Sequence, residues 1–129
     1  MSTPSRSDPL HPQAREGINL FNRGEYYKAH DPLEEAWMET DAPERVLYQG
    51  ILQIGLAYYQ ISRGNYRGAL KMFIRGQRNL APLGDTLLGI DIIQLQEDAR
   101  IVESALRLLG PEKVGQLERE LIRPVPEIE

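Results

Sequence analysis

The strongest constraint on this sequence is a run of 17 residues without a charge, "VLYQGILQIGLAYYQIS", at positions 46–62. Its length approaches the shortest stretch that can cross a membrane as a helix. Three glutamines and two glycines interrupt it, however, and buried amides are costly in hydrocarbon unless protein surrounds them. We therefore expect this segment to be the central helix of a bundle, enclosed by other helices of the same chain.

Apolar residues recur at helical spacing along the whole chain, and no stretch has the sustained alternation that predicts a β-strand. Proline, glycine and capping residues divide this pattern into separate helices, with Asp8, Asp41 and Asn65 as the expected caps. The expected helices cover residues 9–23, 25–39, 44–63, 66–80 and 92–109, with a loop at 82–90 and a short helical turn at 112–121. The sequence thus predicts an all-α fold, a compact single-domain bundle of about five helices.

The length of 129 residues suits one domain with one hydrophobic core. We expect the helical bundle to occupy residues 9–121, between a flexible N-terminus at 1–8 and a flexible C-terminal tail at 122–129. The tail contains two prolines and few apolar residues, a composition that packs poorly by itself.

Composition excludes several classes of protein. The chain has no cysteine, so disulfides, thiolate zinc sites, iron–sulfur clusters and cysteine nucleophiles are excluded. Its net charge of −4 gives no overall attraction to nucleic acid or to anionic lipid. The first residues contain no apolar run of signal-peptide length, and we expect a cytoplasmic protein that is not bound to a membrane.

The stretch "YKAHDPLEEAW", at 27–37, joins an apolar stripe to a histidine, several carboxylates and a proline. Pro32 lacks a backbone donor and crowds the preceding helical turn. One interpretation is a single kinked helix, which the continuous stripe from Tyr26 to Trp37 favours. The other is a new helix that begins here, with Asp31 as its cap and Glu34 closing a capping box.

A short motif occurs twice, 40 residues apart, as "GEYYKA" from Gly24 and "GNYRGA" from Gly64. Each copy begins the second helix of a pair, and its small alanine lets two helices approach closely. The repeat resembles a tetratricopeptide unit and predicts helical hairpins. It also raises the hypothesis of an interaction module that binds a protein segment or a second copy of the chain.

A polar cluster is expected between the second and third helices. His30 and Glu34 are one helical turn apart, and the third helix carries uncharged amides along one face at Gln49 and Gln53. Trp37 would supply an apolar wall. We expect these five residues to face one another and to be the ligand-binding residues of a small pocket.

Three interpretations of this cluster stand side by side. It is a buried hydrogen-bond network that only stabilises the bundle, a pocket for a small ligand, or an enzyme site in which His30 is the acid or base and Glu34 orients it. No other residue is a catalytic candidate, and we expect binding rather than catalysis. A metal site needs at least three protein ligands and these residues supply two, so no metal and no cofactor is expected.

A basic stripe follows the fourth helix at spacings of three and four residues, formed by Arg63, Arg67, Lys71, Arg75 and Arg78. It lacks the interleaved aromatic residues of a nucleic-acid surface, and we expect it to be a solvated face that pairs with carboxylates of the fifth helix. The expected partners are therefore a small molecule, a protein segment or a second copy of the chain, and not nucleic acid.

The stretches "LFNRGEYYKAHDPLEEAW", "LYQGILQIGLAYYQISRGNYRGALKMF" and "LGIDI" resemble domain-of-unknown-function family number 309, over residues 17–109. The resemblance implies a compact all-helical bundle without an established activity. The family's characteristic positions fall on Gly24, Tyr26, Ala29, His30, Asp31, Glu34, Trp37, Gln49, Gly50, Gln53, Gly64, Asn65, Ala69 and Asp91. The chain departs from the family pattern in having aspartate at position 31, where glutamate is commoner, and proline at position 32.

Overall fold

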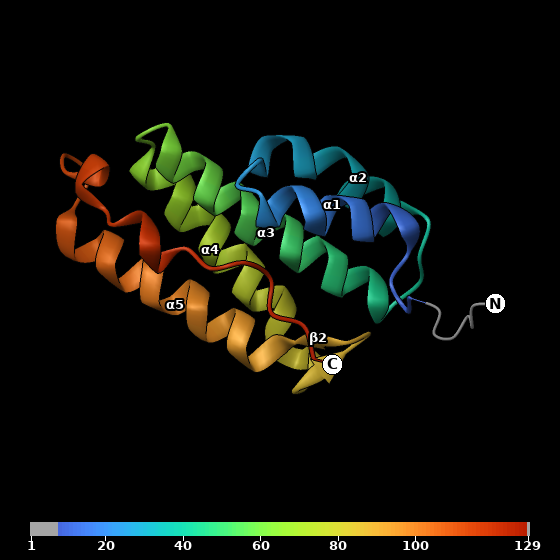
Figure 1. Cartoon of the computed structure of the whole chain (residues 1–129). Coiled ribbons are helices and arrows are strands. Elements are labelled where there is room, and N and C mark those ends of the chain that lie inside the picture. The colour runs from blue at the N-terminus through green and yellow to red at the C-terminus, as the bar shows by residue number, and fades with distance from the viewer. Residues whose placement is uncertain (1–7, 129) are drawn as a thin grey trace.

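The structure is a computed structural model that describes residues 8–128, and the expected N-terminal segment before residue 8 lies outside this range. It confirms the all-α prediction, with a bundle of five helices (Figure 1). The helices are α1 Pro12–Asn22, α2 Tyr26–Met38, α3 Glu44–Ser62, α4 Tyr66–Leu80 and α5 Ile92–Leu109. Each therefore begins and ends within a few residues of its expected bounds.

The helices pack in chain order, so that α3 lies between α2 on one side and α4 on the other (Figure 1). Nine residues of α3 are buried, namely Leu47, Tyr48, Gly50, Ile51, Leu52, Ile54, Gly55, Ala57 and Tyr58. The uncharged segment at residues 46–62 is therefore enclosed by neighbouring helices, as its composition predicts. Among residues 8–128, no helix is both long enough and apolar enough to cross a membrane.

Two glycines bring α3 and α4 together. A Cβ atom at Gly50 would lie 2.7 Å from the side chain of Leu80, and one at Gly76 would lie 2.8 Å from Ile54 Cδ1. Both values are shorter than a van der Waals contact, so the absence of a side chain sets the distance between these helices.

Aromatic rings fill the core where α1, α2 and α3 meet. The ring of Tyr58 packs edge-on against Phe21 and Tyr26, with centroid distances of 5.8 and 5.6 Å. Phe73 of α4 contacts the same ring at 5.7 Å. Such edge-to-face pairs stabilise a core beyond the area that they bury, and Tyr58 joins three helices to α3.

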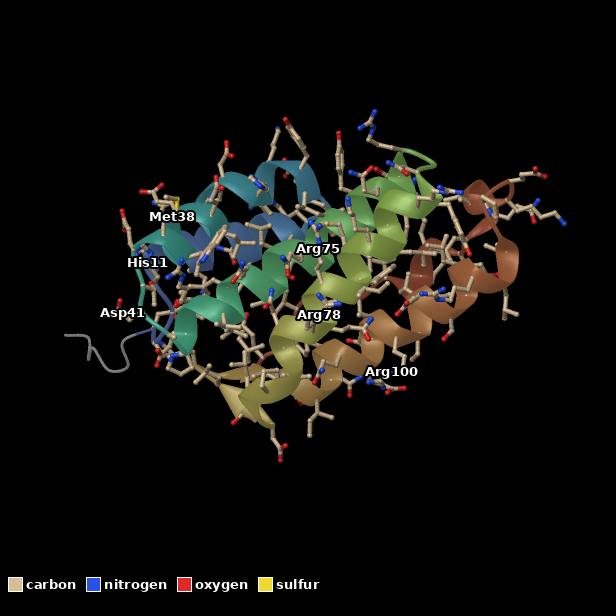
Figure 2. All side chains as sticks on the ribbon, turned by 180° about the vertical axis from the view of Figure 1, so that it is seen from behind. His11, Met38, Asp41, Arg75, Arg78 and Arg100 are labelled. Carbon is tan, nitrogen blue, oxygen red and sulfur yellow. The ribbon has the colours of Figure 1, made fainter. Side chains whose placement is uncertain are left out.

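The caps differ from expectation at the first and third helices. Pro43, and not Asp41, directly precedes α3, and no described side chain caps that helix. His11, and not Asp8, caps α1, because its Nδ1 accepts a hydrogen bond from Gln13 N at 3.0 Å. Its Nε2 therefore carries the proton and donates to Glu39 Oε1, 2.8 Å away at the end of α2 (Figure 2). Asn65 caps α4 as expected, accepting from Gly68 N at 2.9 Å.

The segment at 82–90, expected as a plain loop, contains a small antiparallel hairpin of β1 Thr86–Leu87 and β2 Ile90–Asp91. A 3₁₀ turn, Ala81–Leu83, precedes it. The expected helical turn at 112–121 is two separate 3₁₀ turns, Val114–Gln116 and Arg119–Leu121. These pieces are too short for the periodicity of the sequence to reveal them.

Residues 122–128, expected as a flexible tail, run back along the bundle to the β-hairpin (Figure 1). Val125 is buried, and its backbone N–H donates to Asn22 Oδ1 at 2.9 Å. Further on, Ile128 N donates to Gly89 O at 2.7 Å. The described part of the tail is thus hydrogen-bonded to the end of α1 and to the β-hairpin.

Arg15 of α1 binds two carboxylates, and one of them lies at the end of this segment. Its guanidinium donates to both oxygens of Glu127 at 2.8 Å and to Asp8 Oδ2 at 2.7 Å. The hydrogen bonds to Glu127 and Asp8 raise the pKa of Arg15 further above its usual range, and the bond from Arg15 lowers the pKa of Asp8. The two chain ends of the described structure therefore meet at one cation.

Gly50→Ala is expected to lower the free energy of unfolding by about 1 to 3 kcal/mol, because the added methyl group would overlap Leu80. Urea denaturation followed by circular dichroism measures this change. Gly115→Ala is the matched control, since a Cβ at Gly115 meets nothing within 4 Å and should leave stability unchanged. Equal stability of the two variants would show that the close packing of α3 and α4 does not depend on the absence of a side chain at Gly50.

His11→Ala is expected to destabilise the protein by about 1 kcal/mol, because α1 loses the side chain that caps it. His11→Asn, which retains an acceptor for the helix N-terminus, should recover most of this loss. The same urea titrations test both variants. An equally large loss in His11→Asn would instead assign the stabilisation to the contact with Glu39.

Candidate functional site

The candidate site begins on α2, which continues without a break through Pro32. The structure therefore has the single helix of the first interpretation, and Asp31 lies in its interior and does not cap a new helix. Ala29 and Leu33 are buried, whereas His30 and Glu34 are half-buried and Asp31 is exposed. The polar side chains thus lie along the edge of the helix that meets solvent.

His30, Asp31 and Glu34 form a group of three donors on this edge. Each residue offers one nitrogen or oxygen atom, and these atoms all lie within 4.8 Å of one another. His30 Nδ1 is 3.3 Å from Asp31 Oδ1, and the two side chains are 33% and 93% exposed. An imidazole nitrogen with two carboxylate oxygens is a donor set suited to a divalent cation.

A surface hollow of about 490 Å³ adjoins this group, between α2 and the second half of α3. Its lining residues are Tyr27, His30, Asp31, Leu56, Tyr59, Gln60 and Arg63. The rings of Tyr27 and Tyr59 pack against each other with centroids 5.0 Å apart, and the guanidinium of Arg63 lies 5.8 Å from the Tyr59 ring. His30 is thus open to solvent and lies beside an aromatic wall that carries a positive charge.

The two glutamines of the predicted cluster do not bond to His30 or Glu34 in the described part of the chain. Gln53 Oε1 accepts a hydrogen bond of 2.6 Å from Asn79 Nδ2, on α4. Its amide therefore connects α3 to α4 and not to α2. Gln49 is half-buried on the same helix and takes part in no side-chain hydrogen bond between described residues.

Trp37 differs from the rest of the predicted cluster in having a buried polar atom. Its Nε1 is buried without a hydrogen-bond partner among the described residues. The guanidinium of Arg45 lies 5.9 Å from the centre of its ring, a cation–π contact between the ends of α2 and α3. Trp37 thus packs against the core and does not line the hollow beside His30, while its N–H lacks the acceptor that such groups normally find.

The basic stripe of α4 does not pair with α5 as expected. Arg75 and Arg78 project from α4 (Figure 2), and neither forms an ion pair with a described residue. The carboxylates of α5 bond within their own helix, Glu97 to Arg100 and Glu103 to Arg107. Among the described residues, Gln77 is the one side chain of α4 that hydrogen-bonds to α5, donating to Glu103 Oε1 at 2.9 Å.

Sequence reasoning missed three contributors to the hollow, namely Asp31 as a metal-ligand donor, the exposed ring of Tyr27 and the half-buried ring of Tyr59. A signal for the rings exists, because tyrosine doublets occur at 26–27 and 58–59. In each doublet the first ring packs in the core and the second at the surface. In two antiparallel helices, such doublets meet at the same level.

Residues 14–72 match the model of a family described as "Domain of unknown function (DUF309)". The chain is also 24% identical over 102 residues to a protein of Aquifex aeolicus (strain VF5) named "Uncharacterized protein". That alignment covers 78% of this chain and 29% of the relative, so the chain spans less than a third of the relative's length. The family model confirms, over residues 14–72, the resemblance to DUF309 that the sequence motifs predict.

Proposed function

We propose that this chain is a small-ligand-binding protein, and that its ligand is a divalent metal ion held by His30, Asp31 and Glu34. The observation that carries the proposal is the convergence of the three donor atoms within 4.8 Å on one helix. Two carboxylates and one imidazole leave coordination positions free, and these positions face solvent. A small molecule in the adjoining hollow would complete the coordination of the ion.

The two carboxylates of the cluster favour a cation at this place, and the guanidinium of Arg63, which lines the same hollow, opposes it. Asp31 and Glu34 are three residues apart on one helix, a spacing at which like charges repel each other. No described lysine or arginine forms an ion pair with either carboxylate. A bound cation would relieve this repulsion, and that gain adds to the free energy of binding.

The exposure of the cluster favours ligand binding over a purely structural role. The core of the described chain contains no fully buried polar or charged residue, so packing of α2 needs no internal network around His30. His30 instead lines the hollow, where a ligand has access to it. The interaction module and the enzyme with His30 as acid or base stay predictions from the sequence.

Titration with Zn²⁺, followed by isothermal calorimetry and by amide chemical shifts, tests this proposal. Wild-type protein should bind one equivalent, with the largest shifts around His30 in α2 and near Tyr59. His30→Ala should weaken binding at least tenfold, because the nitrogen ligand is lost, and Asp31→Asn should weaken it to a smaller extent.

His11→Asn is the matched control, because it removes the other histidine of the chain and retains an acceptor at the cap of α1. It should bind Zn²⁺ as the wild type does. Failure of the wild type to bind either Zn²⁺ or Mn²⁺ saturably would contradict the proposal. Binding that is unaffected by His30→Ala would do so equally.

A further inference from the structure

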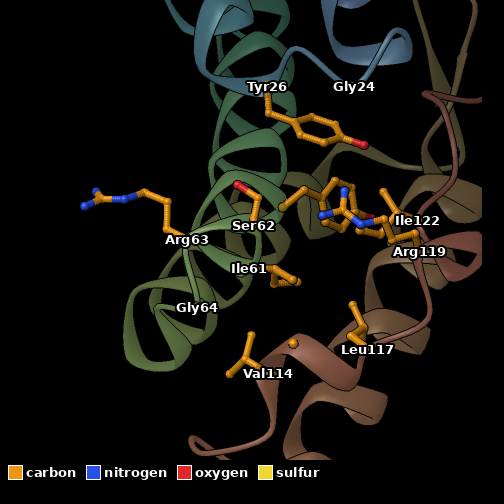
Figure 3. Close-up of a pocket in the computed structure, with 12 residues that line it drawn as sticks. Gly24, Tyr26, Ile61, Ser62, Arg63, Gly64, Val114, Leu117, Arg119 and Ile122 are labelled. Carbon is orange, nitrogen blue, oxygen red and sulfur yellow. The ribbon is translucent and has the colours of Figure 1, made fainter.

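A second cavity, of about 530 Å³, lies where the C-terminal segment crosses the ends of α2 and α3 (Figure 3). None of the three proposed metal ligands, His30, Asp31 and Glu34, lines this cavity. Its lining residues are Gly24, Tyr26, Tyr58, Ile61, Ser62, Arg63, Gly64, Val114, Gly115, Leu117, Arg119 and Ile122. A cavity of this size falls in the range that small organic ligands occupy.

Much of the wall of this cavity is apolar. Ile61 comes from α3, while Val114, Leu117 and Ile122 come from the segment that covers the opening (Figure 3). Val114 and Leu117 are also buried against the main core, which fixes their positions. A ligand with an apolar body would therefore remove apolar surface from water on both sides of the cavity.

Tyr58 contributes a hydroxyl group that lacks a partner. The residue is only 1% exposed and lines the cavity, yet its hydroxyl forms no hydrogen bond with any described residue. Burial is the main cause that raises its pKa, so the group stays protonated and is a hydrogen-bond donor. Because this hydroxyl reaches the surface of the cavity, it is free to donate to an acceptor on a ligand.

Arg119 brings a positive charge to the same cavity. Its guanidinium extends into the cavity in Figure 3, whereas the side chain of Arg63 points away from it. Arg119 forms no ion pair within the described part of the chain. Burial raises the pKa of Tyr26, and the positive charge of Arg119, which lines the same cavity, opposes this shift.

The remaining polar side chain at the wall is already occupied. The hydroxyl of Ser62 donates its hydrogen to the carbonyl oxygen of Tyr59. The donors left for a ligand are therefore the guanidinium of Arg119 and the hydroxyls of Tyr58 and Tyr26. All three favour an acceptor that carries negative charge.

We propose that this cavity binds a small monocarboxylate with an apolar body. The carboxylate accepts from Arg119 and from the two tyrosine hydroxyls, and the body packs against Ile61, Leu117 and Ile122. A single guanidinium matches one negative charge, whereas a phosphate group carries up to two charges at neutral pH. The apolar walls disfavour inorganic anions, which have nothing to place against them.

Octanoate is the probe that tests this proposal, with 1-octanol, acetate and inorganic phosphate as comparisons. Amide chemical shifts and calorimetry measure binding to the full chain. Octanoate should bind at least tenfold more tightly than 1-octanol, and the shifts should centre on Ser62, Gly64 and Gly115. Acetate and phosphate should not bind at the concentration at which octanoate saturates the protein.

Arg119→Gln should weaken octanoate binding at least tenfold and leave 1-octanol binding unchanged, because only the charged contact is removed. Arg123→Gln is the matched control, since Arg123 is exposed and does not line the cavity. Tyr58→Phe keeps the core ring and should weaken octanoate binding by a smaller factor; circular dichroism checks that each variant is folded. Equal binding of octanoate by wild type and Arg119→Gln, or no saturable binding at all, would overturn the assignment.

These measurements are independent of the Zn²⁺ titration. His30→Ala should bind octanoate as the wild type does, and Arg119→Gln should bind Zn²⁺ as the wild type does. Failure of one site therefore leaves the other unaffected.

Discussion

Removal of residues 46–62 from water is the constraint on which the rest of the structure depends. A helical segment of this length without a charge is poorly suited to full exposure, and neighbouring helices cover it on two sides. α2 and α4 do so, and α4 approaches closely because Gly50 and Gly76 carry no side chain where the helices touch. The amides of α3 remain at the seams of this packing. The amide of Gln53 meets Asn79 of α4 at one of these seams.

The helical part of the fold could be predicted from the sequence because each helix is marked locally. Glycine ends α1 and α3, with φ angles of +82° at Gly24 and +73° at Gly64 that favour glycine over other residues. The course of residues 122–128 could not be predicted in this way. Its contacts join Val125 to Asn22 and Ile128 to Gly89, and no local pattern encodes such distant pairs. Proline content alone therefore misrepresents this segment.

The candidate site could be predicted only in part, for a similar reason. Helical spacing places His30 and Glu34 on one edge of α2. This placement could be predicted because it depends only on the sequence within one helix. The partner of Gln53 depends on which neighbouring helix carries the nearer polar group. Asn79 of α4 takes this place, and its distance of 26 residues along the chain hides it from periodicity arguments. The role of Asp31 likewise required knowledge that α2 continues through Pro32.

The segment that crosses the second cavity is fastened on both sides. It is buried in the core at Val114 and Leu117 and again at Val125, beyond which Arg15 holds Glu127. A segment held at both ends cannot rotate away about one end. The space beneath it can open only if the residues between the two ends move outward. Entry into the space beneath it would therefore displace the residues between Leu117 and Val125 while both buried ends stay in place, and the exposed ion pair of Arg15 and Glu127, which added salt weakens, lies outside this stretch.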